Sequence, residues 1–308
     1  MTIDIVNGKR VSELGTVTAL TETDKLMVQT ANGSKIIRFD KLKEIITPKT
    51  CDYFNEGRDL TVLFADEIAT YGDAWAWIQA RLDAHNLDDL RDGDYIPVTM
   101  SSGEVLIMQI AGINTYEGIF SGAVKPHIDW ISRDCLATTH NWNASNDNNG
   151  TSAEAQPFMA SAVYAWLNSS DVYGKLPEEV RAVIKGKRLY MPTRYSASGK
   201  LTDDGSWADK TFPHLWLPFE GEIFDHISWS TKGFGTACCV QYPLFAHSWK
   251  ARMKGQGNSG TPVHWWTASS HSGSATHAVY VSAIGLSTNS PASNVLGVSV
   301  CFRTMAAA

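Results

Sequence analysis

Two pairs of closely spaced carboxylates are the first residues in this sequence that could carry out acid–base chemistry. They are Asp203 with Asp204, and Glu220 with Glu222. Hydrolysis of a glycosidic bond needs two carboxyl groups that converge on it, and clustered carboxylates also bind calcium. The first pair lies in a polar stretch that we expect to be a loop, and the second lies within an expected short helix. Because Glu222 is expected to cap that helix or to form an ion pair, we favour structural roles over catalysis or calcium binding.

Three histidines of the C-terminal region could bind a metal ion. They are His264, His271 and His277, with Cys301 as a further ligand. Their spacing does not match a structural zinc site. We therefore interpret the histidines as solvent-facing side chains of a loop rich in serine and glycine, and we expect neither a metal nor another cofactor.

The cysteines indicate reduced thiols rather than a disulfide framework. Their number is odd, and no pair has CxxC spacing. They are Cys51, Cys135, Cys238, Cys239 and Cys301. A catalytic pair of thiolates would have to be spaced apart, whereas Cys238 and Cys239 are adjacent. We interpret the cysteines as small, mostly buried apolar residues.

The distribution of charge along the chain is the most informative feature of its composition. Residues 255–302 contain no Asp, Glu, Lys or Arg, although these residues make up 19% of the chain. The segment is instead rich in Ser, Thr, Gly, Asn and His, with Trp265, Trp266 and Tyr280. Small polar groups form adaptable hydrogen bonds and aromatic rings give rigid contact area, which is typical of a recognition surface. A packed β-sheet core with Ser/Gly turns is the alternative interpretation.

Consecutive tryptophans on a strand point to opposite faces. We therefore expect one of Trp265 and Trp266 to face the core and the other to be available for a ligand, and we choose Trp266 for the latter. Residues 268–294 are expected to lie exposed on the connections between strands. The residues predicted to contact the ligand are Trp266, Ser269, Ser270, His271, Ser274, Thr276, His277, Tyr280, Ser282, Thr288, Asn289 and Asn294.

The composition of the whole chain excludes several classes of protein. The net charge is -6 and no basic block occurs, which disfavours binding to nucleic acid. No run of 18 apolar residues is present, so we expect no membrane insertion. The N-terminal residues lack the apolar region of a signal peptide.

Residues 1–48 are predicted to form a small separate module. Strands are expected at residues 16–20, 25–30 and 34–39, with an Asn32-Gly33 turn signal between the last two, and a short helix at residues 40–46. A unit of this size buries little core. We therefore expect it to associate with copies of itself or to dock to a larger partner.

Residues 50–308 are predicted to form a single α+β domain. Helices are expected at residues 73–84, 157–168, 177–185 and, after Pro218, 217–224. Strands are expected at residues 94–100, 104–113, 188–191, 263–267, 278–284 and 295–302. Polar loops are expected at residues 130–150 and 196–210. Asp73 is the expected cap of the first helix, and Pro177 is expected at the first position of the third.

A series of short motifs follows a recognisable order along residues 90–303. They are Gly93-Asp94-Tyr95, Gln109-Ile110-Ala111-Gly112-Ile113, Tyr164-Ala165-Trp166-Leu167-Asn168, Leu176-Pro177, Leu215-Trp216-Leu217-Pro218, Glu222-Ile223-Phe224, Tyr242-Pro243-Leu244-Phe245, Trp265-Trp266 with Ser269-Ser270, and Gly297-Val298. In order and spacing the series resembles a bacterial and phage domain of unknown function that is related to the C-type-lectin-like fold. Two places depart from that pattern: Ala268 stands where the family usually has Arg, and Gly297-Val298-Ser299-Val300 replaces an ending Gly-Val-Arg-Pro.

The N-terminal module resembles the virion-attachment segment of phage tail fibres, through residues 16–28 and 35–42. Together the two resemblances imply a non-enzymatic tail-fibre or receptor-binding protein of a phage or prophage. It would be made in the bacterial cytoplasm, assembled as a homo-trimer with other tail or baseplate proteins, and would adhere to a bacterial surface receptor.

Some lectin-fold phage proteins are diversified near the C-terminus by retroelements that mutate adenines, and residues 255–303 resemble such a target. The alternative, also by resemblance, is an enzyme on the same fold. It would be either a surface-polysaccharide hydrolase or an oxidase like the formylglycine-generating relatives.

Overall fold

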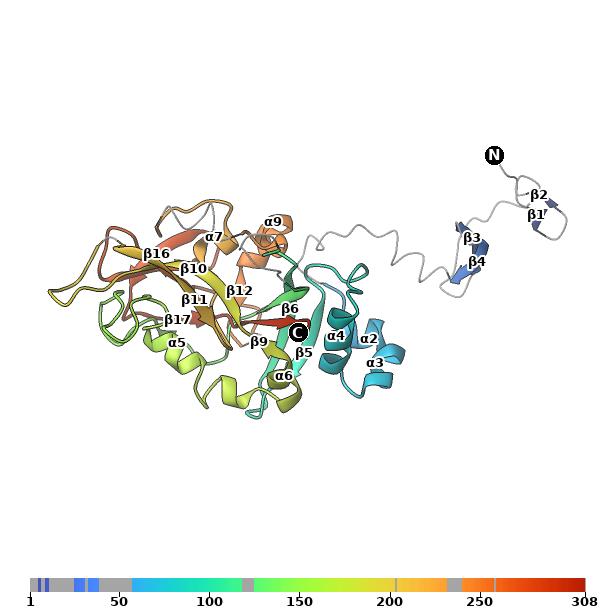
Figure 1. Ribbon diagram of the computed structural model, residues 1–308, viewed down its shortest axis with the longest axis horizontal. Coiled ribbons are helices and arrows are strands. Elements are labelled where there is room, and N and C mark those ends of the chain that lie inside the picture. The colour runs from blue at the N-terminus through green and yellow to red at the C-terminus, as the bar shows by residue number, and fades with distance from the viewer. Residues whose placement is uncertain are drawn as a thin grey trace. The chain divides into compact units, whose positions relative to one another are not determined.

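The computed structural model describes residues 57–117, 125–202, 204–231, 240–257 and 259–307, together with the backbone of four strands nearer the N-terminus. The chain divides into two compact units, Met1–Lys49 and Thr50–Ala308 (Figure 1). No helix within the described ranges is long and apolar enough to cross a membrane.

The first unit contains two antiparallel strand pairs. Strand β1 (Ile5–Val6) pairs with β2 (Lys9–Arg10), and β3 (Lys25–Thr30) pairs with β4 (Gly33–Arg38). The strands predicted at residues 25–30 and 34–39 are therefore confirmed. The strand predicted at residues 16–20 and the helix at residues 40–46 lie outside the described residues.

The second unit begins with three short helices, α2 (Leu60–Leu63), α3 (Ala65–Tyr71) and α4 (Ala74–Asp83). Asp73 caps α4 as predicted, because its Oδ1 accepts hydrogen bonds from the amides of Trp75 at 2.7 Å and Ala76 at 2.8 Å. Trp75 is buried, and its ring lies 5.0 Å from that of Trp130. Figure 1 shows these helices grouped beside β5 (Tyr95–Thr99).

The first five-stranded sheet has the order β5-β6-β7-β18-β9, and all its pairings are antiparallel. Its strands are β5 (Tyr95–Thr99), β6 (Val105–Ile113), β7 (His127–Ser132), β18 (Cys301–Met305) and β9 (Ile184–Lys185). The predicted hairpin at residues 94–113 is confirmed. The predicted loop at residues 130–150 is wrong at residues 130–132, which belong to the buried strand β7, and at β8 (His140–Asn141), which belongs to the second sheet. Asp129 interrupts the apolar pattern of β7, but Arg303 on β18 balances its charge.

The second five-stranded sheet has the order β16-β15-β14-β17-β8. Its strands are β16 (Ser287–Pro291), β15 (His277–Val281), β14 (Trp265–Ser270), β17 (Val295–Val298) and β8 (His140–Asn141). The pair β14–β17 is parallel and the others are antiparallel. Strand β16 was not predicted, because its sequence is entirely polar except for Pro291.

The single strand predicted at residues 295–302 is wrong, because β17 and β18 belong to different sheets. The chain changes sheets at Ser299 and Val300. Ser132 fixes this crossing: its amide donates to Val300 O at 2.8 Å, and its Oγ accepts from the Val300 amide at 3.0 Å. Val298, Val300 and Phe302 are nevertheless all buried.

Two further strand pairs lie outside these sheets. Strand β10 (Lys187–Thr193) pairs with β11 (Ser206–Phe212), and β12 (Lys254–Gly255) pairs with β13 (Pro262–Val263). The predicted loop at residues 196–210 is therefore wrong from Ser206 onward. Most side chains of β11 are exposed or half-buried, and most are polar. Its sequence therefore lacks the apolar alternation by which a strand is recognised.

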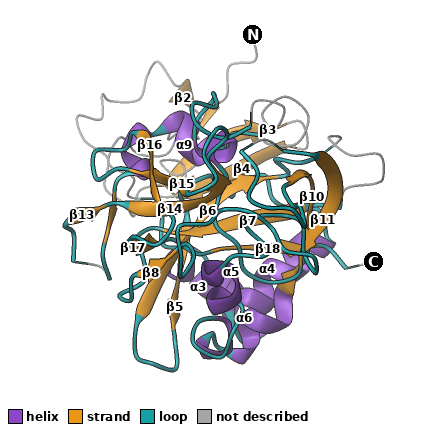
Figure 2. Cartoon of the chain, turned by 90° about the vertical axis from the view of Figure 1, so that its left-hand side faces the viewer, coloured by secondary structure: helices purple, strands orange, loops and turns teal. Residues whose placement is uncertain are grey.

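The remaining helical segments are α5 (Ala162–Leu167), η2 (Tyr173–Lys175), α6 (Glu178–Val183), α7 (Glu220–Ile223), α9 (Pro243–His247) and η3 (Trp249–Arg252). Helix α5 begins later than predicted, because Ser161 Oγ caps it by accepting from the Tyr164 amide. Pro177 is the N-cap of α6 rather than its first residue. Figure 2 shows the strands at the centre of the view, with α4, α5 and α6 gathered on one side. The second unit is thus mixed α and β, with β-sheet predominating.

Candidate functional site

The candidate site lies at the edge of the second sheet. We call it the edge face and define it as β14, β15 and β16, the β14–β15 loop at residues 271–276, and the loop at residues 228–231. Most of the predicted ligand contacts lie in this region and are half-buried rather than exposed, namely Ser270, His271, Ser274, Thr276, His277, Tyr280, Thr288 and Asn289. Ser282, directly after β15, is also half-buried. Asn294, beyond β16, is exposed.

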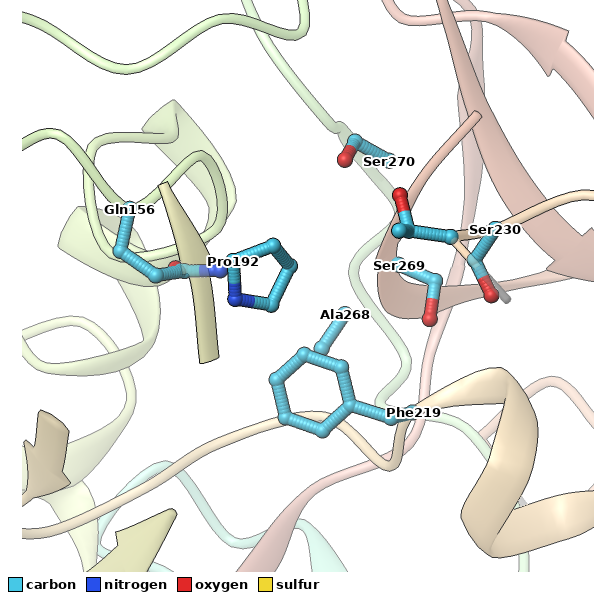
Figure 3. A pocket seen from close by; sticks show the side chains of 8 residues that line it. Gln156, Pro192, Phe219, Ser230, Ala268, Ser269 and Ser270 are labelled. Atoms are coloured by element: carbon cyan, nitrogen blue, oxygen red, sulfur yellow. The ribbon is translucent and has the colours of Figure 1, made fainter. Parts of the chain in front are cut away.

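A small pocket opens beside β14 (Figure 3). Figure 3 shows the rings of Pro192 and Phe219 close together, with Gln156 on one side and the hydroxyls of Ser230, Ser269 and Ser270 on the other. The pocket is small, with a cavity volume of about 20 Å³. Ala268 and Thr231 complete the lining. The pocket therefore combines a small apolar wall with uncharged hydrogen-bonding groups.

Glu220 supports one wall of this pocket from the interior. Its carboxylate is fully buried and accepts hydrogen bonds from the Ser230 amide at 2.8 Å and from Ser230 Oγ at 2.6 Å. It also accepts from the amides of Ser228 and Trp229 and, at 2.5 Å, from Ser287 Oγ on β16. The carboxylate thus joins the 228–231 loop to the edge strand.

A cluster of hydroxyl and imidazole groups lies on the β14–β15 loop. Ser274 Oγ lies 3.0 Å from His277 Nδ1, and Thr276 Oγ1 lies 2.8 Å from the same nitrogen. Partial burial, together with the nearby His271, lowers the pKa of His277 below its usual value. The His277 imidazole is therefore neutral at pH 7, and the cluster offers hydrogen bonds without charge.

Comparison with known proteins adds one assignment. A domain of unknown function, DUF6273, matches residues 130–303, which is more than half of the chain. The chain belongs to the DUF6273 family. Neither the curated proteins nor the solved structures contain a match.

The DUF6273 domain includes both tryptophans of the Trp265-Trp266 pair, and both are fully buried. The expectation that Trp266 is available to a ligand is therefore wrong. Each indole on the central strand β14 bonds to a different segment of the chain: Trp265 Nε1 donates to Arg252 O at 2.8 Å, and Trp266 Nε1 donates to His140 O at 3.0 Å. Ser269 is also buried, and its Oγ accepts a hydrogen bond from the Glu220 amide at 3.0 Å.

Tyr280 is the aromatic side chain of the edge face that remains half-buried among the predicted contacts. Its ring packs edge-on against Trp266 at 6.1 Å and His264 at 5.2 Å. Its strand partners are Trp266 on β14 and Thr288 on β16. Val279 and Val281, on either side of it in sequence, are buried.

The DUF6273 domain uses the candidate carboxylates for internal contacts. Glu222 is fully buried, and its Oε1 accepts from Lys187 Nζ and the Tyr116 hydroxyl. Asp204 pairs with Arg194, with 3.3 Å between Oδ1 and Nε. Asp203 lies outside the described residues. Glu220 and Glu222 therefore do not form a pair that faces an open cleft.

The candidate metal ligands do not form one cluster. Cys301 is buried in β18 of the first sheet, as predicted, whereas His264, His271 and His277 lie on or beside the second. Of these, His271 and His277 lie close together, with 6.3 Å between their ring centroids. Across the described ranges, no group of three or more His, Cys, Asp or Glu side chains could hold a metal ion. Cys51, Cys238 and Cys239 lie outside those ranges.

Three residues that form or support the edge face were not predicted from the sequence: Asn148, Arg194 and Trp229. Asn148 lies in the asparagine-rich stretch at residues 141–150, which is part of the polar loop predicted at residues 130–150. Its side chain is nevertheless fully buried. Arg194 is also fully buried. Arg194 follows β10 as an isolated charge, and the residues that bond to it lie at several places along the chain. The sequence therefore gives no sign that Arg194 is buried.

Proposed function

We propose that this protein is a non-enzymatic receptor-binding subunit of a phage or prophage tail fibre. Its C-terminal domain would have a C-type-lectin-like fold and would adhere to a ligand on the bacterial surface through the edge face. The observation that carries this proposal is the make-up of that face. The face displays short hydroxyl and imidazole side chains. Its backbone is held by hydrogen bonds with three buried side chains, Glu220, Arg194 and Asn148.

The chemistry of the edge face supports adhesion rather than hydrolysis. Ser270, Ser274, Thr276 and His277 offer neutral donors and acceptors, and Tyr280 offers a rigid aromatic contact. Such groups adapt to varied polar ligands at low entropic cost. The carboxylates of Glu220 and Glu222 are engaged in the interior, where hydrogen bonds and an ion pair already satisfy them.

The N-terminal unit supports the assembly part of the proposal. At the level of sequence, its residues 16–28 and 35–42 resemble the attachment segments of tail fibres. We propose that residues 1–48 join the protein to the virion and to copies of itself as a homo-trimer. Light scattering of the full-length chain at micromolar concentration tests self-association, and a monomer would contradict the trimer.

The C-terminal segment supports a further part of the proposal, which is diversification by a retroelement that changes adenines. The DNA alone tests it. A near-identical template copy downstream, differing from codons 265–303 only at adenines, is the expected finding. Its absence would remove this part and leave adhesion to be judged by binding.

The adhesion proposal is tested by measuring binding of fluorescently labelled full-length protein to a panel of intact bacterial cells. We expect the wild type to bind at least one strain without releasing sugar. His277→Ala should weaken that binding and leave the melting temperature nearly unchanged. Tyr280→Ala should also weaken it, with some loss of melting temperature because the ring packs against Trp266. Tyr71→Ala, at an exposed tyrosine on α3, is the matched control and should bind normally.

Two results would overturn the proposal. One is release of sugar from the cell envelope by the wild-type protein, which would identify a hydrolase. The other is binding that survives substitution of Ser274, Thr276, His277 and Tyr280 together, which would place the adhesive surface elsewhere on the chain.

A further inference from the structure

The β14–β15 loop is anchored by one buried amide side chain. Asn148 is fully buried, and its Nδ2 lies 3.4 Å from His271 O, 2.6 Å from Ser274 O and 2.5 Å from His277 O. Its own backbone amide donates to Ala275 O at 3.1 Å. All four contacts end on carbonyl oxygens of the main chain, and none involves a side chain of the loop.

Arg194 holds the same loop through the same kind of atom. Its Nη1 donates to His271 O at 3.0 Å and to Asn148 Oδ1 at 3.0 Å. Its Nη2 donates to Thr202 O at 3.0 Å, and its Nε pairs with Asp204. One guanidinium therefore fixes Asn148, the β14–β15 loop, Thr202 and Asp204 relative to one another.

Further hydrogen bonds of the loop also run between main-chain atoms. The Ser272 amide donates to Trp229 O at 2.7 Å, and the Gly273 amide donates to Thr202 O at 2.9 Å. Thr276 O accepts from the Ala292 amide at 2.9 Å. The path of the backbone is thus determined from both sides of the loop.

The loop's own side chains contribute little to this anchoring. The hydroxyls of Ser274 and Thr276 and the imidazole of His277 bond to one another. Ser272 and His271 are exceptions: Ser272 Oγ donates to Trp229 O at 2.9 Å, and the His271 ring lies 5.5 Å from that of Trp229. Replacing Ser274, Thr276 or His277 would remove bonds within the loop and leave the anchoring bonds in place.

We infer that Asn148 and Arg194 are positioning residues that hold residues 271–277 as a preformed binding loop, whose side chains can change while its backbone path stays fixed. The role of the loop in binding rests on the proposed function; its anchoring does not. A preformed loop loses less conformational entropy when it binds a ligand. A backbone held by carbonyl contacts also tolerates many side chains, because every residue type carries the same carbonyl group.

Hydrogen–deuterium exchange of the full-length protein tests the anchoring directly. The reporters are the amides of His271, Ser272 and Gly273, which donate to His277 O, Trp229 O and Thr202 O. We expect them to be protected in the wild type, although the loop is only half-buried. In Asn148→Asp, an oxygen replaces the donor that faces three carbonyl oxygens, and exchange at these amides should become about tenfold faster or more.

Two matched variants isolate the cause. Asn294→Asp makes the same chemical change at an exposed asparagine and should leave the exchange unaltered. The triple variant Ser274→Ala, Thr276→Ala, His277→Ala removes the hydroxyl–imidazole cluster and should also leave exchange at the three reporters nearly unchanged. If Asn148→Asp does not fold, Arg194→Lys, which keeps the charge but loses the forked donors, should accelerate the same amides.

The outcomes separate this inference from the proposed function. Unprotected reporters in the wild type would overturn the anchoring, as would a triple variant that loosens the loop as much as the Asn148 or Arg194 variants. If exchange behaves as expected but the triple variant binds bacterial cells like the wild type, the anchoring stands and the loop is not the adhesive site. If the triple variant loses cell binding while its reporters stay protected, both the anchoring and the binding role are supported.

Discussion

Buried charged side chains have different kinds of partner beside the first sheet and at the edge face. Beside the first sheet, charged side chains pair with one another: Lys187 with Glu222, and Arg303 with Asp129. At the edge face, Glu220 and Arg194 mostly contact main-chain amides and carbonyls instead. Pairing between side chains requires both residue types to be present, whereas contact with the main chain leaves the neighbouring side chains free to vary. The first arrangement fixes the fold, and the second fixes the path of loops.

Tyr242 extends the first arrangement into a network. Its hydroxyl accepts from Lys187 Nζ at 2.6 Å and donates to Asp129 Oδ2 at 3.1 Å. Burial opposes ionisation of Asp129, but the positive charges of Arg303 and Lys187 outweigh it, so the pKa of Asp129 lies well below its usual value. The network therefore links β7, β10, β18 and α9 through matched charges.

The largest expected effect comes from breaking the pair beside the first sheet. Lys187→Met should lower the free energy of unfolding by roughly 3–5 kcal/mol, because it leaves the buried Glu222 carboxylate without its cation. Urea denaturation of the purified protein measures the change. The double variant Lys187→Met, Glu222→Leu should recover part of the loss. A single-variant loss comparable to that of an exposed site would contradict the role given to this pair.

Lys254 sharpens the comparison, because it is a buried cation held by carbonyl groups. Its Nζ donates to Ser132 O at 2.6 Å and Arg133 O at 3.1 Å. Burial lowers its pKa to about 8. Between about pH 8 and pH 10.5 the unfolded chain binds a proton at this lysine that the folded protein does not. This group alone therefore makes the free energy of unfolding rise with pH, by at most about 3 kcal/mol.

The measurement is urea denaturation at several pH values from 7.5 to about 10 for the wild type and Lys254→Met. The difference between the two proteins isolates Lys254 from thiols and tyrosines that titrate in the same range. The wild type should gain stability relative to the variant as the pH rises. A difference that does not vary with pH would show that the lysine keeps an ordinary pKa.

A smaller effect is expected at the edge face when Glu220 loses its charge. Glu220→Gln should lower the free energy of unfolding by about 1–3 kcal/mol, because an amide replaces a carboxylate that accepts bonds from the 228–231 loop and Ser287. Thermal unfolding measures the loss. Glu179→Gln, at an exposed position on α6, is the matched control and should change little.

The smallest effect is expected for the side chains displayed on the loop. Ser274→Ala and Thr276→Ala should each change the free energy of unfolding by no more than about 0.5 kcal/mol, because their hydroxyls bond only within the loop. Urea denaturation of each variant measures it. A loss as large as that of Glu220→Gln would show that side chains, rather than main-chain contacts, hold the loop.

Local patterns predicted the elements whose stabilising contacts are close in sequence. The Asp73 cap, the β5–β6 hairpin and the short helix after Pro218 all follow from residues within a few positions of one another. The edge face was predicted less well. The charge-free segment located it, but nothing in that segment indicates that Asn148 and Arg194 anchor it, since those contacts span 77 to 129 residues.

The sequence by itself determined the α+β composition of the second unit and the absence of charge from residues 255–302. These properties depend on residue types and short-range periodicity. Only the tertiary structure decided that both Trp265 and Trp266 are buried, that residues 295–305 divide between two sheets, and that Glu222 pairs with Lys187. The physical reason is the same in each case. Burial and pairing depend on what other elements place against a residue, and those elements lie far away along the chain.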